Sequence, residues 1–345
     1  MHATWYFLLA GMLAAYAVLD GFDFGAGIVH LFVAKTDAER RAVLGAIGPL
    51  WDGNEVWLIA SGGVLFFAFP RAYSAAFSGL YLALMLVLWL LILRGISIEL
   101  RSHSKHPLWC AAWDATFAAS SSAMAIVLGV ALGNVVRGVP IDATGYFEQD
   151  LFATPGGAQP GAVDPFTAVF GVFAFTVLGA HGATFLAWKT SGSVHDRCRE
   201  AGLRLWLASL VLLPFVTATI ALGEPGFFGR FMARAPLWLL PPCAAAAAFV
   251  ARRSLADGRE LRAFLASSAF IALMLFATAG AMYPTILRST IDPAFTVSAH
   301  SAASNRDSLA VGLLLCTPGI VLAVGYLAYS FRAFRGKSDG AAARH

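Results

Sequence analysis

The sequence predicts an all-α polytopic membrane protein, and composition and run length carry this prediction. Of the 345 residues, 59% are hydrophobic and only 13% are charged, and the mean hydropathy is +0.71. A water-soluble core could not bury so much apolar surface, whereas a bilayer solvates it. The apolar residues also recur as runs of roughly 20, the length that a helix needs to cross the hydrocarbon layer. We expect a single integral membrane domain over residues 1–331 and a cytoplasmic tail over 332–345.

Nine such runs can be read along the chain, which predicts nine transmembrane helices. Several contain proline, which membrane helices tolerate where neighbouring groups satisfy the freed carbonyls. The longer connections, 136–163 and 285–308, are rich in Pro, Gly, Ser and Asp and are expected to be loops without strands. The predicted helices cover residues about 5–33, 49–69, 75–98, 112–135, 164–188, 204–223, 235–251, 262–284 and 309–331.

The distribution of Lys and Arg predicts the orientation of these helices. The first, third, fifth and seventh connections and the C-terminal tail together hold 18 of the 24 Lys and Arg residues. Cytoplasmic connections carry an excess of basic residues, so the N-terminus is expected outside and the tail inside. A count of eight or ten helices would break this alternation. The basic pI of about 9.0 then requires no nucleic-acid partner, because the charges lie where membrane topology places them.

Acidic residues inside the apolar runs are the first candidates for function. Asp20 and Asp23 lie near the middle of the first predicted helix. Asp52 and Glu55 lie within about 5 to 10 Å of the cytoplasmic end of the second. Each pair is spaced by three positions and shares one helix face. Acids at membrane depth are costly and recur in proton relays. If the two helices are neighbours, the four carboxylates form a broken file suited to proton uptake from the cytoplasm.

Each acid also has a structural explanation, which the sequence leaves open. Asp20 and Asp23 could pair with cations and fix helix packing. Asp52 and Glu55 could be stabilised by the dipole at a helix N-terminus. Asp114, at the inner start of the fourth predicted helix, could extend the acidic network or cap the helix.

Histidines test whether the chain could itself carry haem. Of eight histidines, only His181 lies in the middle of a predicted span. Bis-histidine ligation would need two facing imidazoles at matched depth, so His181 is expected to be a hydrogen-bonded interior residue. There is also no Walker A loop, no GxGxxG segment after a strand and no zincin motif. We expect no self-contained catalytic site and no metal or cofactor held by this chain. A proton-conducting subunit of a respiratory complex and a proton-coupled secondary transporter remain.

Four ordered motifs in the first 101 residues resemble subunit II of the cytochrome bd-type quinol oxidases, including their cyanide-insensitive branch. The pair Trp113-Asp114 and the segment 133–140 continue the resemblance. One departure lies at 296–301 (TVSAHS), which lacks the Trp-Asp pair that many members carry before the last helix. The four motifs are 17–27 (AVLDGFDFGAG), 48–58 (GPLWDGNEVWL), 77–81 (FSGLY) and 93–101 (LRGISIELR).

The resemblance implies a fold and a function. Members of the family oxidise membrane quinol, reduce dioxygen to water and take protons from the cytoplasm without pumping. Haem b, haem d and the quinol loop belong to the partner, subunit I. Subunit II has nine helices, arranged as two four-helix bundles plus one extra helix, lacks haem and supports assembly of subunit I. This implies a multi-pass protein of the bacterial cytoplasmic (inner) membrane. The resemblance leaves open a small single-helix accessory subunit and a structural quinone or lipid bound to this chain.

The same resemblance implies which acid moves protons. In the family, a proton path toward the oxygen site passes through the acid of the Trp-Asp-Gly-Asn motif, which is Asp52 here. Glu55 would assist it. Asp20 and Asp23 match the acids of the family's first helix, where they are either the deep end of this path or packing groups at the subunit boundary.

Overall fold

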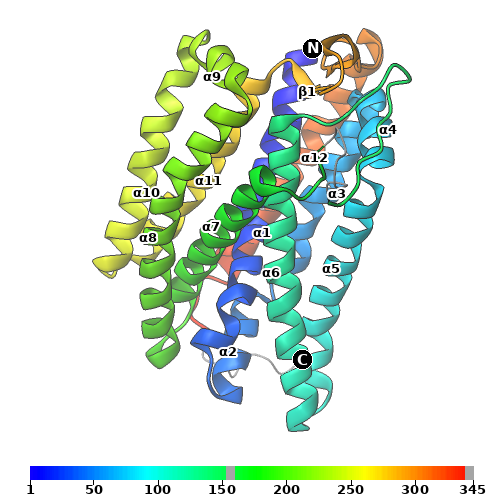
Figure 1. The fold of residues 1–345 in the computed structure, drawn as a ribbon. Coiled ribbons are helices and arrows are strands. Elements are labelled where there is room, and N and C mark those ends of the chain that lie inside the picture. The colour runs from blue at the N-terminus through cyan, green and yellow to red at the C-terminus, as the bar shows by residue number, and fades with distance from the viewer. Residues whose placement is uncertain (153–159, 339–345) are drawn as a thin grey trace.

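The structure is a computed structural model that describes residues 1–152 and 160–338, and long helices lie side by side along most of it (Figure 1). The N-terminus, α4, α9 and β1 lie at one end, and α2 lies at the opposite end. The helices are α1 His2–Val33, α2 Asp37–Ile47, α3 Trp51–Ala68, α4 Pro70–Gly79, α5 Tyr81–Leu100, α6 Pro107–Arg137, α7 Pro165–Lys189, α8 Gly192–Gly223, α9 Pro225–Met232, α10 Leu240–Ala256, α11 Glu260–Met282 and α12 Arg306–Ala333.

Eight helices of the described part are long and apolar enough to cross a membrane. The predicted helix over 49–69 corresponds to α3, which is not among the eight. Its 18 residues make it about 27 Å long, and its polar start, with Asp52, Asn54 and Glu55 within two turns, lowers its apolar character. The eight are α1, α5 with the short 3-10 turn Arg101–His103, α6, α7, α8, α10 with the preceding 3-10 turn Ala235–Leu239, α11 and α12.

The long helices form two groups of four. In the first group α1 packs against α3 and α6, and α5 packs against α6. In the second group α7 packs against α8 and α11, and α10 packs against α8 and α11. The groups meet because α7 lies along both α1 and α6, and α11 also contacts α1.

Glycines let α1 and α7 approach closely. A Cβ atom added to Gly25 would lie 2.0 Å from the Leu178 carbonyl oxygen, and one added to Gly182 would lie 2.2 Å from the carbonyl carbon of Gly25. Small residues at helix contacts are the normal means of close packing in membranes. The contact between the two groups therefore depends on glycine at these two positions.

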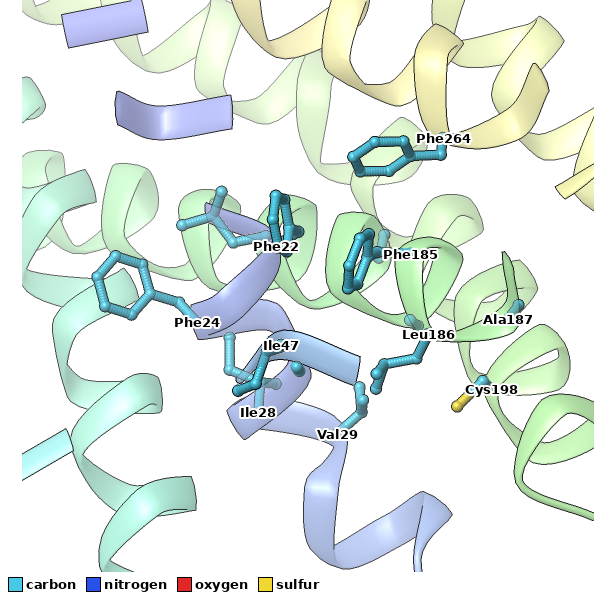
Figure 2. Close-up of a cluster of buried hydrophobic side chains, with 14 of the residues drawn as sticks. Phe22, Phe24, Ile28, Val29, Ile47, Phe185, Leu186, Ala187, Cys198 and Phe264 are labelled. Atoms are coloured by element: carbon cyan, nitrogen blue, oxygen red, sulfur yellow. The ribbon is translucent and has the colours of Figure 1, made fainter. Parts of the chain in front are cut away.

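Aromatic rings fill the core where α1, α7 and α11 meet (Figure 2). Phe22 stacks on Phe185 with ring centroids 4.1 Å apart, and it meets Phe264 edge-on at 5.7 Å. Offset and edge-to-face contacts of this kind add to the stabilisation from burial. They tie the first group of helices to the second.

The last helix, α12, stands apart from both groups. Within α12 only Leu309 and Ser330 are buried. Its first turn is held by the Trp5 indole, whose Nε1 donates to the Leu309 carbonyl at 3.1 Å. Beyond its far end, the buried Lys189 ammonium donates to the Phe334 carbonyl. The helix is therefore attached mainly at its two ends.

The connections differ from the sequence expectations in several places. The first connection contains the short helix α2, which begins with a capping box between Thr36 and Glu39. The single helix expected over 75–98 is divided in the structure: its first residues belong to α4, which ends at Gly79, and the rest belong to α5. The helix expected over 204–223 begins twelve residues earlier, at Gly192.

The expectation that 285–308 holds no strand was wrong. Strand β1, Thr285–Leu287, pairs antiparallel with β2, Val297–Ser298. A parallel bridge between Val139 and Ser289 links this hairpin to the connection after α6. The period-2 signal is absent from the sequence because the strands have only 3 and 2 residues. Residues 153–159 of the other long connection and 339–345 of the tail lie outside the described residues.

Candidate functional site: a buried carboxylate cluster

Arg94 is the centre of a buried charged cluster inside the first group of helices. It belongs to α5, its side chain is fully buried, and its guanidinium donates to Asp20 of α1 and to Glu55 of α3. The guanidinium also lies 4.5 Å from the centre of the Phe24 ring. One cation thus joins three helices, and two carboxylates compensate its burial.

Asp23 lies on the same side of α1 but is held differently. It is fully buried, and the Asn54 amide donates to its Oδ2 at 2.8 Å and to the Leu19 carbonyl at 3.2 Å. Among the described residues, Asp23 Oδ1 and Asn54 Oδ1 have no hydrogen-bond partner. Asp23 therefore has an amide donor but no cation of its own, and the cluster contains three carboxylates and one guanidinium.

Asp52 lies at the surface, one helical turn from Glu55. Its side chain is exposed in the first turn of α3, whereas Glu55 is 23% exposed and is bound to Arg94. Within the described ranges, no hydrogen bond or ion pair engages the Asp52 carboxylate. It is therefore available to a group outside this chain.

Asp114 belongs to a second buried cluster. Its Oδ1 accepts from His30 Nε2 at 2.8 Å and from Arg101 Nε at 2.6 Å. Its Oδ2 accepts from Arg40 at 2.9 Å. Arg101 also donates to Asp37 at 2.9 Å. This carboxylate joins α1, α2 and α6 to the end of α5, and two of its partners, Arg40 and Arg101, are cations.

His181 is a hydrogen-bonded interior residue, as expected. Its Nδ1 lies 2.6 Å from Ser267 Oγ, and its Nε2 lies 2.9 Å from the Val18 carbonyl. The ring stacks on Phe264 with an interplanar angle of 10°. Both ring nitrogens are thus engaged with protein groups. In the described part of the chain, no group of three or more His, Cys, Asp or Glu is placed to hold a metal ion.

An apolar groove of about 800 Å³ lies between α1, α3 and α12. Trp57 and Val64 line it from α3, and Gly319 and Tyr326 line it from α12. The groove exists because α12 is attached at its ends and leaves a space along its middle.

The structure brings some of the sequence candidates together and separates others. Asp20, Asp23 and Glu55 form one cluster, whereas Asp52 is exposed without a partner among the described residues and Asp114 lies in another cluster. The same clusters contain residues that the sequence analysis did not select as site residues. They are Arg94, Asn54, His30, Arg40 and Arg101.

Arg94 could have been found from the sequence. It is one of the 18 Lys and Arg residues counted above, where it was assigned to the third connection with Arg101 and Lys105, but it is 0% exposed and lies inside a helix that could cross the membrane. The signal is an arginine within the apolar run 90–98 (LLILRGISI). Such a residue at membrane depth requires an anionic partner.

The fold and this site define a polytopic helical membrane protein with ionisable groups in its interior. The family model of cytochrome bd terminal oxidase subunit II matches residues 1–334, and the chain belongs to that family. The probable cytochrome oxidase subunit 2 of Haemophilus influenzae is 31% identical over a 360-residue alignment that covers 97% of this chain and 94% of that protein. The cytochrome bd ubiquinol oxidase subunit 2 of Bacillus subtilis is 28% identical, with 97% and 96% covered.

Two further comparisons agree with this assignment. The cytochrome bd-I ubiquinol oxidase subunit 2 of Escherichia coli K12 is 37% identical over 223 residues, which is 65% of this chain and 58% of that protein. Among solved structures, the bd oxidase from Geobacillus thermodenitrificans contains a chain with a TM-score of 0.77 and 16% identity. That match covers 96% of this chain and 98% of the other, and it shows a shared fold.

Proposed function

We propose that this chain is the haem-free subunit II of a membrane quinol oxidase that reduces dioxygen to water. In this role it supports assembly of the haem-bearing subunit I and supplies part of a proton path from the cytoplasm. The family assignment supports an oxidase subunit over a proton-coupled transporter. Haem b and haem d would lie in subunit I, where quinol is also oxidised.

The observation that supports the proton path is the exposure of Asp52 and its lack of an ion-pair partner among the residues that the structure describes. It is the acid of the Trp-Asp-Gly-Asn motif, and it is exposed without a partner in the described chain, whereas Asp20, Glu55 and Asp114 are ion-paired. A relay group must exchange its proton, and an acid that is held by a buried cation exchanges it least readily. Asp52 therefore accepts protons at the surface of α3 and passes them to a group of subunit I.

The deeper cluster has a separate role in this proposal. Three ionised carboxylates beside one guanidinium would bury two uncompensated charges, which is costly in a low-dielectric interior. The cluster is therefore expected to retain at least one proton, and Asp23, which has only an amide partner, is the site we assign to it. Asp20 and Glu55 remain bound to Arg94 and hold α1, α3 and α5 together.

The proposed topology has nine spans, with α3 as the ninth, the N-terminus outside and the tail in the cytoplasm. The length of α3 supports a span. In addition, α2, the α7–α8 turn and the α10–α11 turn all lie away from the end that carries the N-terminus (Figure 1), and these are Lys- and Arg-rich connections. The proposal also includes the location expected from the resemblance, the bacterial cytoplasmic membrane, and a single membrane domain over residues 1–331.

The apolar groove is the site we propose for a structural quinone or lipid, which the resemblance leaves open. Its walls are apolar, and it is long enough to follow α12 from Gly312 to Leu327. The small accessory subunit that the resemblance leaves open is not assigned to a site on the described residues.

The Asp52→Asn substitution tests the proton path in the assembled complex. The amide preserves size but cannot carry a proton in turnover, so quinol-driven oxygen consumption should fall by about 10-fold or more, in line with the loss of a positioned proton-transfer group. Haem content and complex yield should stay at the level of the unmodified enzyme. Oxygen uptake with a soluble quinol and the reduced-minus-oxidised haem spectrum measure the two effects.

Asp196→Asn is the matched control. Asp196 lies in the first turns of α8, and its side chain is 80% exposed, so it reports a general loss of surface negative charge. Normal turnover in the Asp52 variant, or equal slowing in both variants, would contradict a specific relay at Asp52. Loss of haem from the Asp52 variant alone would instead indicate a role in assembly.

A further inference from the structure

A hollow of about 550 Å³ opens beside the first turns of α11, away from the carboxylate cluster. Its apolar lining includes Leu261 and Leu265, whose side chains are 47% and 58% exposed, and Trp188 from the end of α7. Because α11 is apolar enough to cross a membrane, these outward-facing leucines lie on a surface suited to contact with lipid. Trp188 lies at the end of its helix, where tryptophan commonly marks the headgroup level of the bilayer.

Two arginines complete the lining of this hollow. Arg259 precedes α11 and Arg262 lies in its first turn, so they are spaced by three positions and share a face. Both side chains are exposed, and no hydrogen bond or ion pair engages either of them within the described residues. The neighbouring Arg199, by contrast, is engaged within the protein, since its guanidinium donates to the Leu255 and Ala256 carbonyls. Arg259 and Arg262 are thus free to bind an anion.

The remaining charged groups around the hollow leave it positive. Glu260 also lines it, but its Oε1 lies 3.0 Å from His195 Nε2. Lys337 of the tail is near enough to Glu260 to act on it electrostatically. The buried Lys189 ammonium is occupied by the Phe334 and Gly336 carbonyls. Two unengaged guanidinium groups therefore face a surface whose single carboxylate already has a partner.

We propose that this hollow binds an anionic phospholipid, with the phosphate on Arg259 and Arg262 and an acyl chain along Leu261, Leu265 and Trp188. Guanidinium groups suit phosphate because their donors match its oxygens in pairs. A basic hollow between transmembrane helices at the headgroup level has the chemistry that recognises anionic lipid. The inference does not depend on the proton path.

The test uses the purified complex with subunit I, stripped of lipid in detergent and titrated with short-chain phosphatidylglycerol. Native mass spectrometry counts the bound lipids, and phosphatidylcholine of the same chain length serves as the zwitterionic comparison. The unmodified complex should bind phosphatidylglycerol more tightly than phosphatidylcholine. The R259Q/R262Q variant should bind phosphatidylglycerol roughly 30-fold more weakly, the change expected for two headgroup contacts of ordinary strength.

Arg252→Gln is the matched control, since Arg252 is exposed at the end of α10 but does not line the hollow. It should leave lipid binding unchanged. Equal binding of the two lipids, or equal weakening by R252Q, would overturn the proposal. Displacement of the lipid by inorganic phosphate at a similar concentration would show a free-anion site instead. Loss of subunit I from the R259Q/R262Q variant would show a protein interface, whereas retained haem content and lost lipid would support the lipid site.

Discussion

The Arg94 guanidinium and the Asp20 carboxylate form an ion pair in which both side chains are 0% exposed. Arg94 comes from α5 and Asp20 from α1, and Glu55 of α3 binds the second nitrogen of the same guanidinium. Removing one member of a buried pair leaves an uncompensated charge, which costs more than the pair itself contributes. The pair is therefore a point at which single substitutions should have large effects.

Arg94→Met should destabilise the complex by about 3 to 5 kcal/mol, because Asp20 and Glu55 would lose their shared cation in a buried setting. The measurements are the yield of haem-bearing complex and the midpoint of its thermal unfolding. The stability of the Arg94→Lys variant should lie between that of the Met variant and that of the unmodified complex. An ammonium keeps the charge but cannot bridge two carboxylates with a planar fork. A stability of the Met variant equal to that of the unmodified complex would contradict the pairing.

Asp20→Asn and Asp23→Asn should differ although the two acids are one turn apart. Asp20→Asn removes one anion from Arg94 and is expected to cost about 3 kcal/mol. Asp23→Asn replaces an acid that has an amide partner and no cation, so its cost should stay below about 1 kcal/mol. The thermal midpoints of the two purified variants measure this difference. Equal midpoints would contradict the pairing of Arg94 with Asp20 rather than Asp23.

Asp114→Asn should weaken the end of the molecule where α1, α2 and α6 meet. The carboxylate is hydrogen-bonded to His30 and has two cationic partners, Arg40 and Arg101, and its neutralisation would leave buried positive charge at a cost of about 3 to 5 kcal/mol. Asp37→Asn is the control, because its side chain is 52% exposed and surface pairs contribute about 1 kcal/mol at most. Limited proteolysis near α2 measures the loosening.

Glu39 should make stability depend on acidic pH. The Ser193 hydroxyl donates to it at 2.7 Å, and this bond is the largest influence on its pKa. Partial burial opposes it, while Arg197 and the Lys35 and Thr36 backbone amides add to it, so the pKa falls to about 2. The folded pKa is below the unfolded value of about 4.3. This stabilisation is therefore present above about pH 4.3 and is lost as pH falls toward 2.

The Glu39→Gln variant should therefore unfold at a lower temperature at neutral pH and show a smaller fall in midpoint between pH 4.3 and 2. Differential scanning fluorimetry across that range measures both effects. Glu200→Gln supplies the control, since the Glu200 side chain is 62% exposed and, among the described residues, forms its ion pair with Arg204, one turn along α8. Identical pH profiles for the Glu39 variant and the unmodified protein would count against the bonds to Ser193 and Arg197.

Much of the helical framework follows from the sequence, because a run of apolar residues long enough to cross a bilayer has few other stable conformations. The short elements do not. Helix α2 is amphipathic, but its charged residues make its sequence look like a connection. Strands β1 and β2 are too short to show an alternation of apolar and polar residues. Arg94 was misplaced because basic residues were assigned to connections by count. Pairing across helices, which buries Arg94 and leaves Asp52 exposed, depends on helix rotation and is not encoded in local spacing.

The two attachments of α12 imply that this helix docks only after the two groups of helices have been assembled. This helix leaves the ribosome after α1 and α7, and chains fold largely from the N-terminus as they are made. Its contacts with Trp5 and Lys189 belong to α1 and α7, which come from different groups of helices. Both contacts exist together only after those groups have reached their final relative position. Docking of α12 would therefore act as a checkpoint, since a chain whose two groups of helices are misaligned cannot make both contacts with α12.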